Sequence, residues 1–337
     1  MSYITKIIFI LIVFFLLTIK PYCNEQQEVK YLIVTDIVAN IRAKPVDATT
    51  SYIKDDLQET QVLFNEGIIC KDEIEDWFFV ECIEQQEFNH NNKWEGYPGW
   101  IKKSQVKVVK SLPKYNLVIK KLSTNIYSSP NKDSKTIISL PLGVRLEFVS
   151  ETTDYYKIVL PISPFYGWIK KSDVNNISDI LPPQKVRENI IQTATQLLGT
   201  PYLWGGRSPL ILSLQHRIVT GVDCSGFTSL VYRANNIIIP RDAHEQWMYS
   251  KPITEISELK PADLIFISKK QNLQNIGHVM MYVSGELFIE SDTTTNASFV
   301  KYRTFKQKFG YSLEELKKLN FEVDDRKIYF GRIPQIE

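Results

Sequence analysis

The sequence predicts a multidomain protein, with two small β-rich units in tandem followed by a larger domain of mixed α and β structure. One observation behind this prediction is an internal repeat in the first half of the chain, where polar and apolar residues alternate as in short strands. The other is a change to helical periodicity after two consecutive prolines. The chain has 337 residues, which is enough for two or three domains.

The composition is that of an ordinary globular protein. Hydrophobic residues make up 44% of the chain and charged residues 23%, which argues against intrinsic disorder. The formal net charge is +2, from 40 basic and 38 acidic residues. This balance favours no nucleic-acid partner, because nucleic-acid-binding proteins carry an excess of positive charge.

The N-terminus is a predicted targeting segment. Lys6 precedes an apolar run, IIFILIVFFLLTI, which has the length of a signal-peptide hydrophobic region and is short for a membrane span. We therefore expect residues 1–23 to be a signal peptide or an uncleaved anchor, and the remainder to be exported, either periplasmic or secreted. Cys23 permits a lipoprotein as well, but the two residues before it are not the small ones that a lipobox requires.

The internal repeat rests on three pairs of segments in the same order: NIRAKP and NIYSSP, EIEDWFFVE and ETTDYYKIV, GWIKKSQV and GWIKKSDV. Each copy is predicted to be a small β-barrel, at residues 30–109 and 113–177. The first copy is longer because of two polar insertions, VDATTSYIKDDLQE and EQQEFNHNNKWEGYP. Long polar loops on a rigid scaffold commonly carry binding residues, and tolerated insertions are the equal alternative.

The segment SDILPPQKV is the predicted linker to a third domain at residues 184–337. After it, VRENIIQTATQLLG has helical period. One face of that helix is expected to carry these apolar residues: Ile190, Ile191, Ala194, Leu197 and Leu198.

Export permits disulfide bonds. Cys70 and Cys82 flank KDEIEDWFFVE, whose turn is expected near Asp76, so antiparallel strands would bring the two cysteines roughly opposite each other. Either a disulfide or two buried thiols fits this pattern. Cys224 is left without a partner, apart from Cys23 if that residue is retained, and an unpaired cysteine in an exported protein requires an explanation.

Cys224 is the candidate nucleophile. It lies in VDCSGFTSLVYRANN, where the apolar residues after it have the spacing of a helix. At a helix N-terminus, unpaired backbone N–H groups and the positive end of the helix dipole favour a thiolate. A small buried residue is the structural alternative, which the polar neighbours Asp223 and Ser225 disfavour.

His278 is the candidate base among the four histidines. It opens the strand GHVMMYV in the same domain as Cys224, whereas His90 lies in a barrel insertion, His216 in a loop and His244 on a helix surface. The alternative is an ordinary surface histidine. The next strand, ELFIESD, follows a Ser-Gly turn.

A hairpin about the Ser-Gly turn brings Glu290 near His278. Its carboxylate is then the candidate group that orients the imidazole, with Asp292 as the neighbouring candidate. A solvated residue at the edge of the sheet is the alternative for either.

Five segments, LGTPYLWGG, DCSGF, PRDAHEQW, LKPADLIFI and GHVMMYV, resemble the successive motifs of the NlpC/P60 cysteine peptidase family. The GWI endings of the two repeats resemble bacterial SH3-like (SH3b) domains. Together they are most similar to γ-D-glutamyl-L-diamino acid endopeptidases of cell-wall recycling. The resemblance implies two SH3-like β-barrels and an α+β papain-like catalytic domain.

The resemblance also implies roles for individual residues. Cys224 would be the nucleophile, His278 the base and Glu290 the orienting residue, where the family usually has histidine. The substrate-binding residues implied in the catalytic domain are Tyr202, Asp223, Ser225, Arg241 and Asp242. Tyr202 would help to stabilise the oxyanion.

In such relatives the first SH3b domain holds the free amine of the peptide. Tyr97 and Glu59 are the candidates for that role here. The stretch RSPLILSLQHRIVTG is longer than the usual link and would overhang the cleft.

The predicted function is hydrolysis of the bond between γ-D-Glu and the diamino acid, diaminopimelate, in peptidoglycan stem peptides with a free N-terminal L-Ala. We expect a monomer that needs no metal or cofactor and that contacts a membrane only through an uncleaved N-terminal segment. The alternatives are a non-catalytic wall-binding protein and a related cysteine amidase or acyltransferase. Selective alkylation of Cys224 would separate an enzyme from a binding protein.

Overall fold

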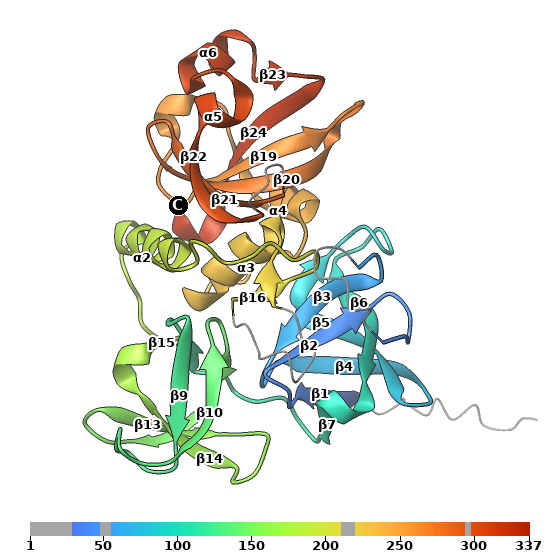
Figure 1. The fold of residues 1–337 in the computed structure, drawn as a ribbon, viewed down its shortest axis with the longest axis vertical. Helices are drawn as coiled ribbons and strands as arrows, with labels where there is room; N and C mark the ends of the chain where they lie inside the picture. Colours follow the sequence, from blue (N-terminus) through green and yellow to red (C-terminus); the bar gives the residue numbers. More distant parts are fainter. Residues whose placement is uncertain (1–28, 48–54, 210–219, 294–297) are drawn as a thin grey trace, which may run out of the picture.

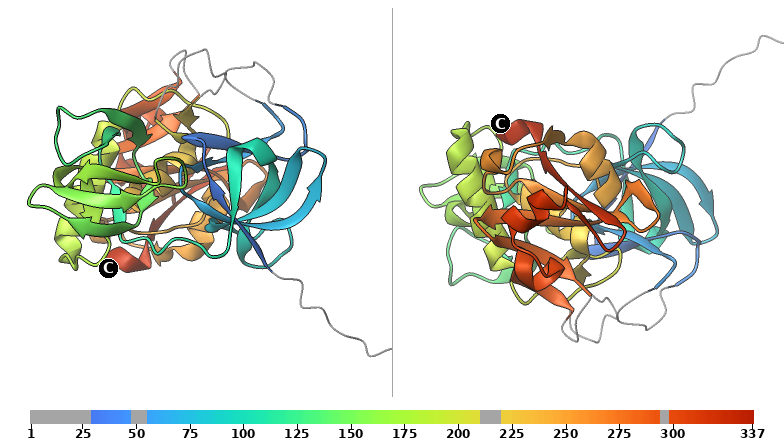
Figure 2. Two further views of the ribbon diagram at one scale, coloured as in Figure 1. Left: turned by 90° about the horizontal axis from the view of Figure 1, so that it is seen from below. Right: turned by 90° about the horizontal axis from the view of Figure 1, so that it is seen from above.

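The computed structural model describes residues 29–47, 55–209, 220–293 and 298–337. Figure 1 shows the two β-rich units side by side, with the C-terminal domain above them. Figure 2 shows the molecule from two further directions, and in both views the first and second units lie at opposite ends. No helix within these ranges is long and apolar enough to cross a membrane.

The first unit forms a seven-stranded antiparallel sheet in the order β3-β2-β6-β5-β4-β1-β7. Its strands are β1 (Lys30–Val34), β2 (Val38–Arg42), β3 (Gln58–Leu63), β4 (Gly67–Ile74), β5 (Trp77–Glu87), β6 (Glu95–Lys102) and β7 (Val106–Val109). The described ladder does not close between β3 and β7, so a closed barrel stays a prediction.

The second unit repeats this order in two sheets, β10-β9-β14-β13-β12 and β11-β8-β15. Its strands are β8 (Leu117–Ile119), β9 (Ser123–Tyr127), β10 (Thr136–Pro141), β11 (Arg145–Leu146), β12 (Phe148–Glu151), β13 (Tyr155–Val159), β14 (Tyr166–Lys170) and β15 (Val174–Asn176). The two GWIKKS segments fold alike: each strand runs into a short 3₁₀ helix, η1 (Lys103–Gln105) or η2 (Lys171–Asp173). The structure therefore agrees with the repeat seen in the sequence.

Cys70 and Cys82 form no disulfide, so that alternative is wrong. The turn after Ile74 lies where the sequence placed it, but a register shift between Cys70 and Asp72 pairs Cys70 with Val80. Cys82 instead lies opposite Tyr97 on β6. Cys82 is fully buried, and burial raises the pKa of its thiol well above the usual value.

The C-terminal domain packs helices against a twisted antiparallel sheet of order β18-β24-β19-β20-β21-β22, with β23 paired to β24. Its sheet strands are β18 (Lys251–Ile253), β19 (Leu264–Lys269), β20 (Asn272–Ser284), β21 (Leu287–Asp292), β22 (Phe299–Thr304), β23 (Glu322–Val323) and β24 (Arg326–Arg332). The helices are α2 (Pro183–Gln196), α3 (Cys224–Ala234), α4 (Ala243–Tyr249), α5 (Phe305–Phe309), α6 (Leu313–Lys318), η4 (Ile256–Glu258) and η5 (Pro334–Ile336). A two-stranded ribbon, β16 (Arg207–Ser208) and β17 (Gly221–Val222), precedes α3.

Helix α2 differs from its prediction at both ends. Pro183 is its first residue rather than part of the linker, because proline suits the first helical position, where its missing N–H would have no partner. The helix ends at Gln196, so Leu198 is 40% exposed, whereas Ile190 and Ala194 are buried as predicted.

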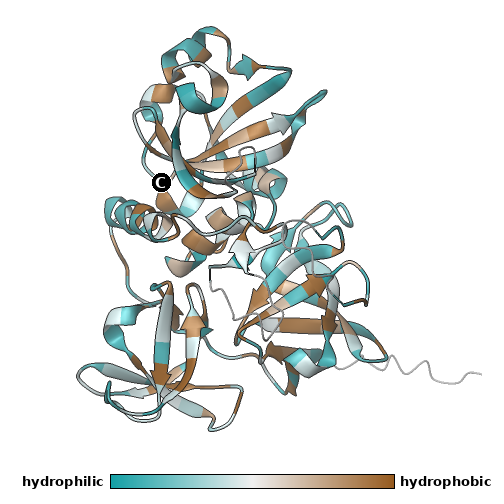
Figure 3. Ribbon diagram, in the orientation of Figure 1, coloured by the Kyte–Doolittle hydropathy of each residue, from teal (hydrophilic) through white to brown (hydrophobic). Residues whose placement is uncertain are grey.

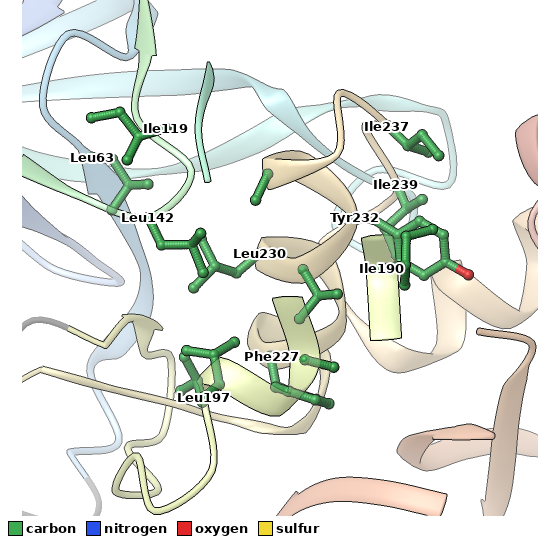
Figure 4. Packing of buried hydrophobic residues seen from close by; sticks show 14 of the residues in the cluster. Leu63, Ile119, Leu142, Ile190, Leu197, Phe227, Leu230, Tyr232, Ile237 and Ile239 are labelled. Atoms are coloured by element: carbon green, nitrogen blue, oxygen red, sulfur yellow. The ribbon is translucent and has the colours of Figure 1, made fainter. Parts of the chain in front are cut away.

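A shared hydrophobic core joins both units to α3. Leu63 of the first unit and Leu142 of the second are fully buried beside Leu230 of α3, as the close view in Figure 4 shows. The same cluster continues into the helices and sheet of the C-terminal domain, whose strands include apolar segments (Figure 3). Burial of this surface fixes the orientation of α3 relative to both units.

A buried ion network crosses the same interface. Glu66, after β3, lies 2.8 Å from an Arg207 guanidinium nitrogen and 3.6 Å from one of Arg233, and all three side chains are at most 2% exposed. Arg233 also pairs with Glu84 on β5. Burial raises the pKa of Glu66, but the two guanidinium groups outweigh this effect and lower the pKa to about 2.

Glu66→Gln should lower the free energy of unfolding by about 3–5 kcal/mol at neutral pH, because it leaves two buried guanidinium groups without their shared carboxylate. The measurement is urea unfolding. The pKa of Glu66 is lowered in the folded state. Its contribution to the free energy of unfolding is therefore fully present above 4.5, the pKa in the unfolded chain, and is lost as the pH falls towards 2. Glu73→Gln, at an exposed carboxylate, should have a much smaller effect, because solvent screens exposed ion pairs. If the two substitutions lowered the free energy of unfolding equally, the proposed stabilising role of Glu66 in the buried ion network would be wrong.

Candidate active site

Cys224 is the first residue of α3, as predicted, and it is partly exposed. Asp223 caps the helix, and its Oδ1 accepts a hydrogen bond from the Gly226 backbone N–H at 2.6 Å. A Cβ atom on Gly226 would lie 2.1 Å from the carbonyl oxygen of Gly206, so only glycine permits this close approach. The packing of the WGG segment on α3 thus fixes where the cysteine side chain begins.

His278 and Glu290 lie on adjacent strands, β20 and β21, which are joined by a turn at Gly285 and Glu286, one residue later than the sequence predicted. The His278 Nε2 atom lies 2.7 Å from Glu290 Oε2, and the Glu290 side chain is fully buried. Burial lowers the pKa of His278, but hydrogen bonds to Cys224 and Glu290 raise it to about 9. The structure therefore brings together all three residues that the sequence singled out for catalysis.

Two basic residues, which the sequence analysis did not indicate, also contact Glu290. Lys308 of α5 places Nζ 2.6 Å from Glu290 Oε2 and 3.2 Å from Asp292 Oδ2. Arg303 of β22 lies 3.3 Å from both carboxylates. Burial raises the pKa of Glu290, but the hydrogen bond and charge of His278 and the ammonium of Lys308 lower it overall. Glu290 therefore stays ionised despite its burial.

The ligand atoms of His278, Glu290 and Asp292 lie within 4.8 Å of one another, a spacing that a metal ion could use. Lys308 contacts both carboxylates of this group. Its ammonium already supplies positive charge at the place a metal ion would take, so these residues do not fit a metal centre.

Cys224 and His278 open into a cavity of about 630 Å³. Tyr202, predicted to assist at the nucleophile, lines the same cavity, as do Trp204 and Lys308. Burial, followed by the nearby Cys224 and Asp223, raises the pKa of Tyr202 above its usual value, so its hydroxyl keeps its proton.

Arg241 connects the start of α3 to the first unit. Its guanidinium donates to both oxygens of Asp223, at 3.1 and 2.8 Å, and to Ser225 Oγ at 3.0 Å. Its Nε donates to Thr60 Oγ1 of β3 at 2.7 Å. Asp223, Ser225 and Arg241 are all at least nine-tenths buried and bonded to one another. Their direct contact with substrate stays a prediction.

The remaining predicted residues meet at the interface between the first unit and α4. Tyr97 Oη on β6 lies 3.1 Å from Asp242 Oδ2 and 3.3 Å from Glu59 Oε2 on β3. A phenol has one proton, so it can donate to only one of the two carboxylates. Burial, though opposed by the Arg241 guanidinium, raises the pKa of Asp242 to about 6, and the nearby Glu245 adds to that rise. This arrangement is suited to binding a cation.

Other sequence candidates lie elsewhere. His244 is on α4 and stacks on Trp247, with its Nδ1 accepting from the Ile276 N–H at 3.3 Å. Residues 1–28, 48–54 and 210–219 are outside the described residues. The described residues therefore do not include the predicted targeting segment or His216. They also leave out much of the stretch RSPLILSLQHRIVTG and part of the first polar insertion.

Comparison with known proteins identifies the family. Residues 199–312 match the NlpC/P60 family profile. The chain is 31% identical over 243 residues to a γ-D-glutamyl-L-lysine dipeptidyl-peptidase of Bacillus subtilis (strain 168), covering 71% of this chain and 74% of the relative. The chain belongs to the NlpC/P60 family. It is therefore a cysteine peptidase, which confirms the resemblance seen in the sequence.

Two further relatives of this NlpC/P60 peptidase come from Bacillus cereus. One, also named a γ-D-glutamyl-L-lysine dipeptidyl-peptidase, is 30% identical and covers 69% of this chain and 67% of its own length. The other is a solved NlpC/P60 family structure with a TM-score of 0.70 and 23% identity, covering 90% of this chain and 99% of that one. The solved structure shows that the fold is shared over nearly the whole chain.

In this NlpC/P60 peptidase, Glu290→Gln should move the alkaline limb of the kcat/KM profile to lower pH by about one unit. The carboxylate raises the pKa of His278, so without it the imidazolium loses its proton at a lower pH. The thiolate then loses the positive charge that stabilises it, and activity falls. We also expect kcat to fall by about 10²–10⁴. The check is a pH profile of hydrolysis; an unchanged limb would move the orienting role away from Glu290.

Lys308→Met should move the same limb in the opposite direction, to higher pH. The ammonium of Lys308 lowers the pKa of His278, so its removal lets the imidazolium persist. Lys308→Arg should restore the original profile, because it keeps the charge. Lys306→Met, at an exposed lysine of the same helix, is the matched control and should leave the limb in place. A shift to lower pH in Lys308→Met would refute this account.

Proposed function

We propose that this peptidase hydrolyses the bond between γ-D-Glu and the diamino acid of peptidoglycan stem peptides that have a free N-terminal L-Ala. The observation that carries the proposal is the pair of carboxylates, Glu59 and Asp242, at one phenol oxygen of Tyr97. An ammonium group would complete this arrangement, because it can donate to the carboxylate that the phenol leaves without a proton.

These three residues, Glu59, Tyr97 and Asp242, form the proposed amine site. It is linked to the nucleophile through covalent and hydrogen bonds. Asp242 follows Arg241 in the chain, and the Arg241 guanidinium bonds Asp223, which precedes Cys224. A short N-terminal segment of substrate would therefore extend from the amine site to the thiol. The relatives named dipeptidyl-peptidases support this proposal, because release of a dipeptide requires recognition of a free amine two residues before the scissile bond.

In the proposed reaction the Cys224 thiolate attacks the γ-carbonyl carbon of D-Glu and forms a C–S bond. Backbone N–H groups at the start of α3, together with the Tyr202 hydroxyl, would stabilise the oxyanion. The His278 imidazolium gives its proton to the leaving amine of the diamino acid as the C–N bond breaks. Neutral His278 then takes a proton from water, whose oxygen attacks the thioester and releases the thiolate. Glu290 orients the imidazole throughout.

The architecture fits the same proposal. We assign the two units at residues 30–109 and 113–177 to SH3-like barrels, and residues 184–337 to a papain-like catalytic domain in a monomeric, exported protein. Two observations support the assignment to SH3-like barrels: the two units share one strand order, and their GWIKKS segments fold alike. Diaminopimelate is the proposed diamino acid, and lysine is the alternative that the names of the relatives suggest.

The test compares L-Ala-γ-D-Glu-diaminopimelate, the corresponding lysine peptide and their N-acetylated forms by mass spectrometry of the products. Acetylation removes the positive charge that the two carboxylates would bind. We expect it to lower kcat/KM by about 10²-fold or more, since it leaves charged groups unpaired. Cys224→Ala should lose activity by on the order of 10⁶-fold and serves as the inactive control.

Glu59→Gln should reduce the discrimination between free and acetylated peptides, because it removes one of the two carboxylates. Glu75→Gln, at an exposed turn of the same unit, is the matched control and should preserve it. Equal cleavage of free and acetylated peptides by the unmodified protein would refute the amine site and point to intact cell wall as the substrate. Cleavage by Cys224→Ala at more than a tenth of the original rate would refute the mechanism.

A further inference from the structure

The second insertion of the first unit places a histidine beside the amine site. His90 lies after β5, and its ring meets the ring of Tyr97 edge-on at a centroid distance of 5.3 Å. Its Nδ1 lies 2.9 Å from Glu87 Oε2, which also accepts the His90 backbone N–H at 3.0 Å. The side chain of His90 is 40% exposed, so it can exchange protons with solvent.

Carboxylates surround this histidine. The acidic cluster consists of Glu59, Glu87, Asp242 and Glu245. Glu87 and Glu245 are each 1% exposed. Each has one carboxylate oxygen that is buried and without a hydrogen-bond partner among the described residues. The acidic cluster is therefore suited to bind further positive charge.

The cations nearby are engaged elsewhere. Arg241 lies 3.7 Å from Asp242, but its short contacts are to Asp223, at 2.8 Å. Lys93, in the same insertion, pairs with Glu95 at 2.8 Å. His90 and Asp242 are therefore the groups at this site whose charge changes near neutral pH, and of these two a protonated His90 is the one that adds positive charge.

We propose that His90 determines the specificity of the amine site: a neutral imidazole leaves the acidic cluster able to bind the ammonium of the stem peptide, whereas an imidazolium competes with that ammonium. The inference rests on the proposed function, since it concerns the same amine site. Two cations that share one set of carboxylates repel each other, so protonation of His90 weakens the binding of substrate without touching the reacting atoms.

The electrostatic surroundings support this role. Partial burial lowers the pKa of His90, but its bond to Glu87 outweighs burial and the pKa is raised overall. The charges of Glu59 and Asp242 act in the same direction. His90 thus binds a proton up to a higher pH than an ordinary histidine. The substrate's α-amine loses its own proton near about pH 8, so binding of the free amine is confined to a window between the two titrations.

The test measures the dissociation constant of L-Ala-γ-D-Glu-diaminopimelate with the full chain carrying Cys224→Ala, by calorimetry across pH. At about pH 6, adding His90→Gln should tighten binding by on the order of tenfold, because no imidazolium forms. At about pH 7.5, adding His90→Lys should weaken binding by a similar factor, because it makes the positive charge permanent. Titration of Asp242 is present in every variant, so the differences report on His90.

Three controls separate the possible outcomes. Lys93→Gln removes a positive charge from the same insertion away from the acidic cluster and should not change binding. The N-acetylated peptide has no ammonium, so its weak binding should not respond to His90→Lys. In active protein, His90→Lys should raise KM while kcat stays within about twofold, which a loss of folding would not produce.

Equal binding by the His90→Gln variant and its parent at about pH 6 would overturn the inference, even if His90→Lys fails to fold. Failure of the proposed function has a different signature. In that case the parent binds free and acetylated peptides equally well at every pH, whatever residue stands at position 90.

Discussion

The buried ion pair between Arg241 and Asp223 determines the geometry on which both parts of the site depend. Asp223 caps α3 and so fixes the position of Cys224, while its carboxylate accepts two hydrogen bonds from Arg241. Arg241 also donates a hydrogen bond to Thr60 of the first unit, and the next residue in the chain is Asp242 of the proposed amine site. Removing one partner of such a pair leaves a buried charge, so the nucleophile helix, the first unit and the amine site are energetically coupled.

At the other end of the site, the third polar residue beside Cys224 and His278 is a glutamate. A buried carboxylate brings a negative charge that histidine would not, and it remains ionised only with positive charge nearby. Lys308 and Arg303 supply that charge from α5 and β22. The C-terminal elements therefore do more than complete the sheet, because they set the electrostatic environment of His278.

The two repeated units have diverged in what they contribute. The second unit presents Leu142 to α3 and packs into the common core. The first unit adds the buried network at Glu66 and carries Glu59, Tyr97 and His90 at the substrate side. One sheet architecture thus serves mainly for packing in one copy and as a wall of the proposed binding site in the other.

Local patterns in the sequence were sufficient to predict the repeat, the helix that begins at Cys224 and the hairpin that pairs His278 with Glu290, since periodicity and a turn decide which side chains approach. Tertiary packing decided the rest. The exact turn position and a one-residue register shift together placed Cys70 opposite Val80 rather than Cys82, and the helix end at Gln196 exposed Leu198. The basic partners of Glu290 and the position of His90 beside Tyr97 could not be predicted from the sequence either. A cation on another element, or a histidine in a loop, leaves no periodic pattern in the sequence. Its neighbours are set only when distant segments pack, and that packing fixes the charges around the predicted catalytic residues.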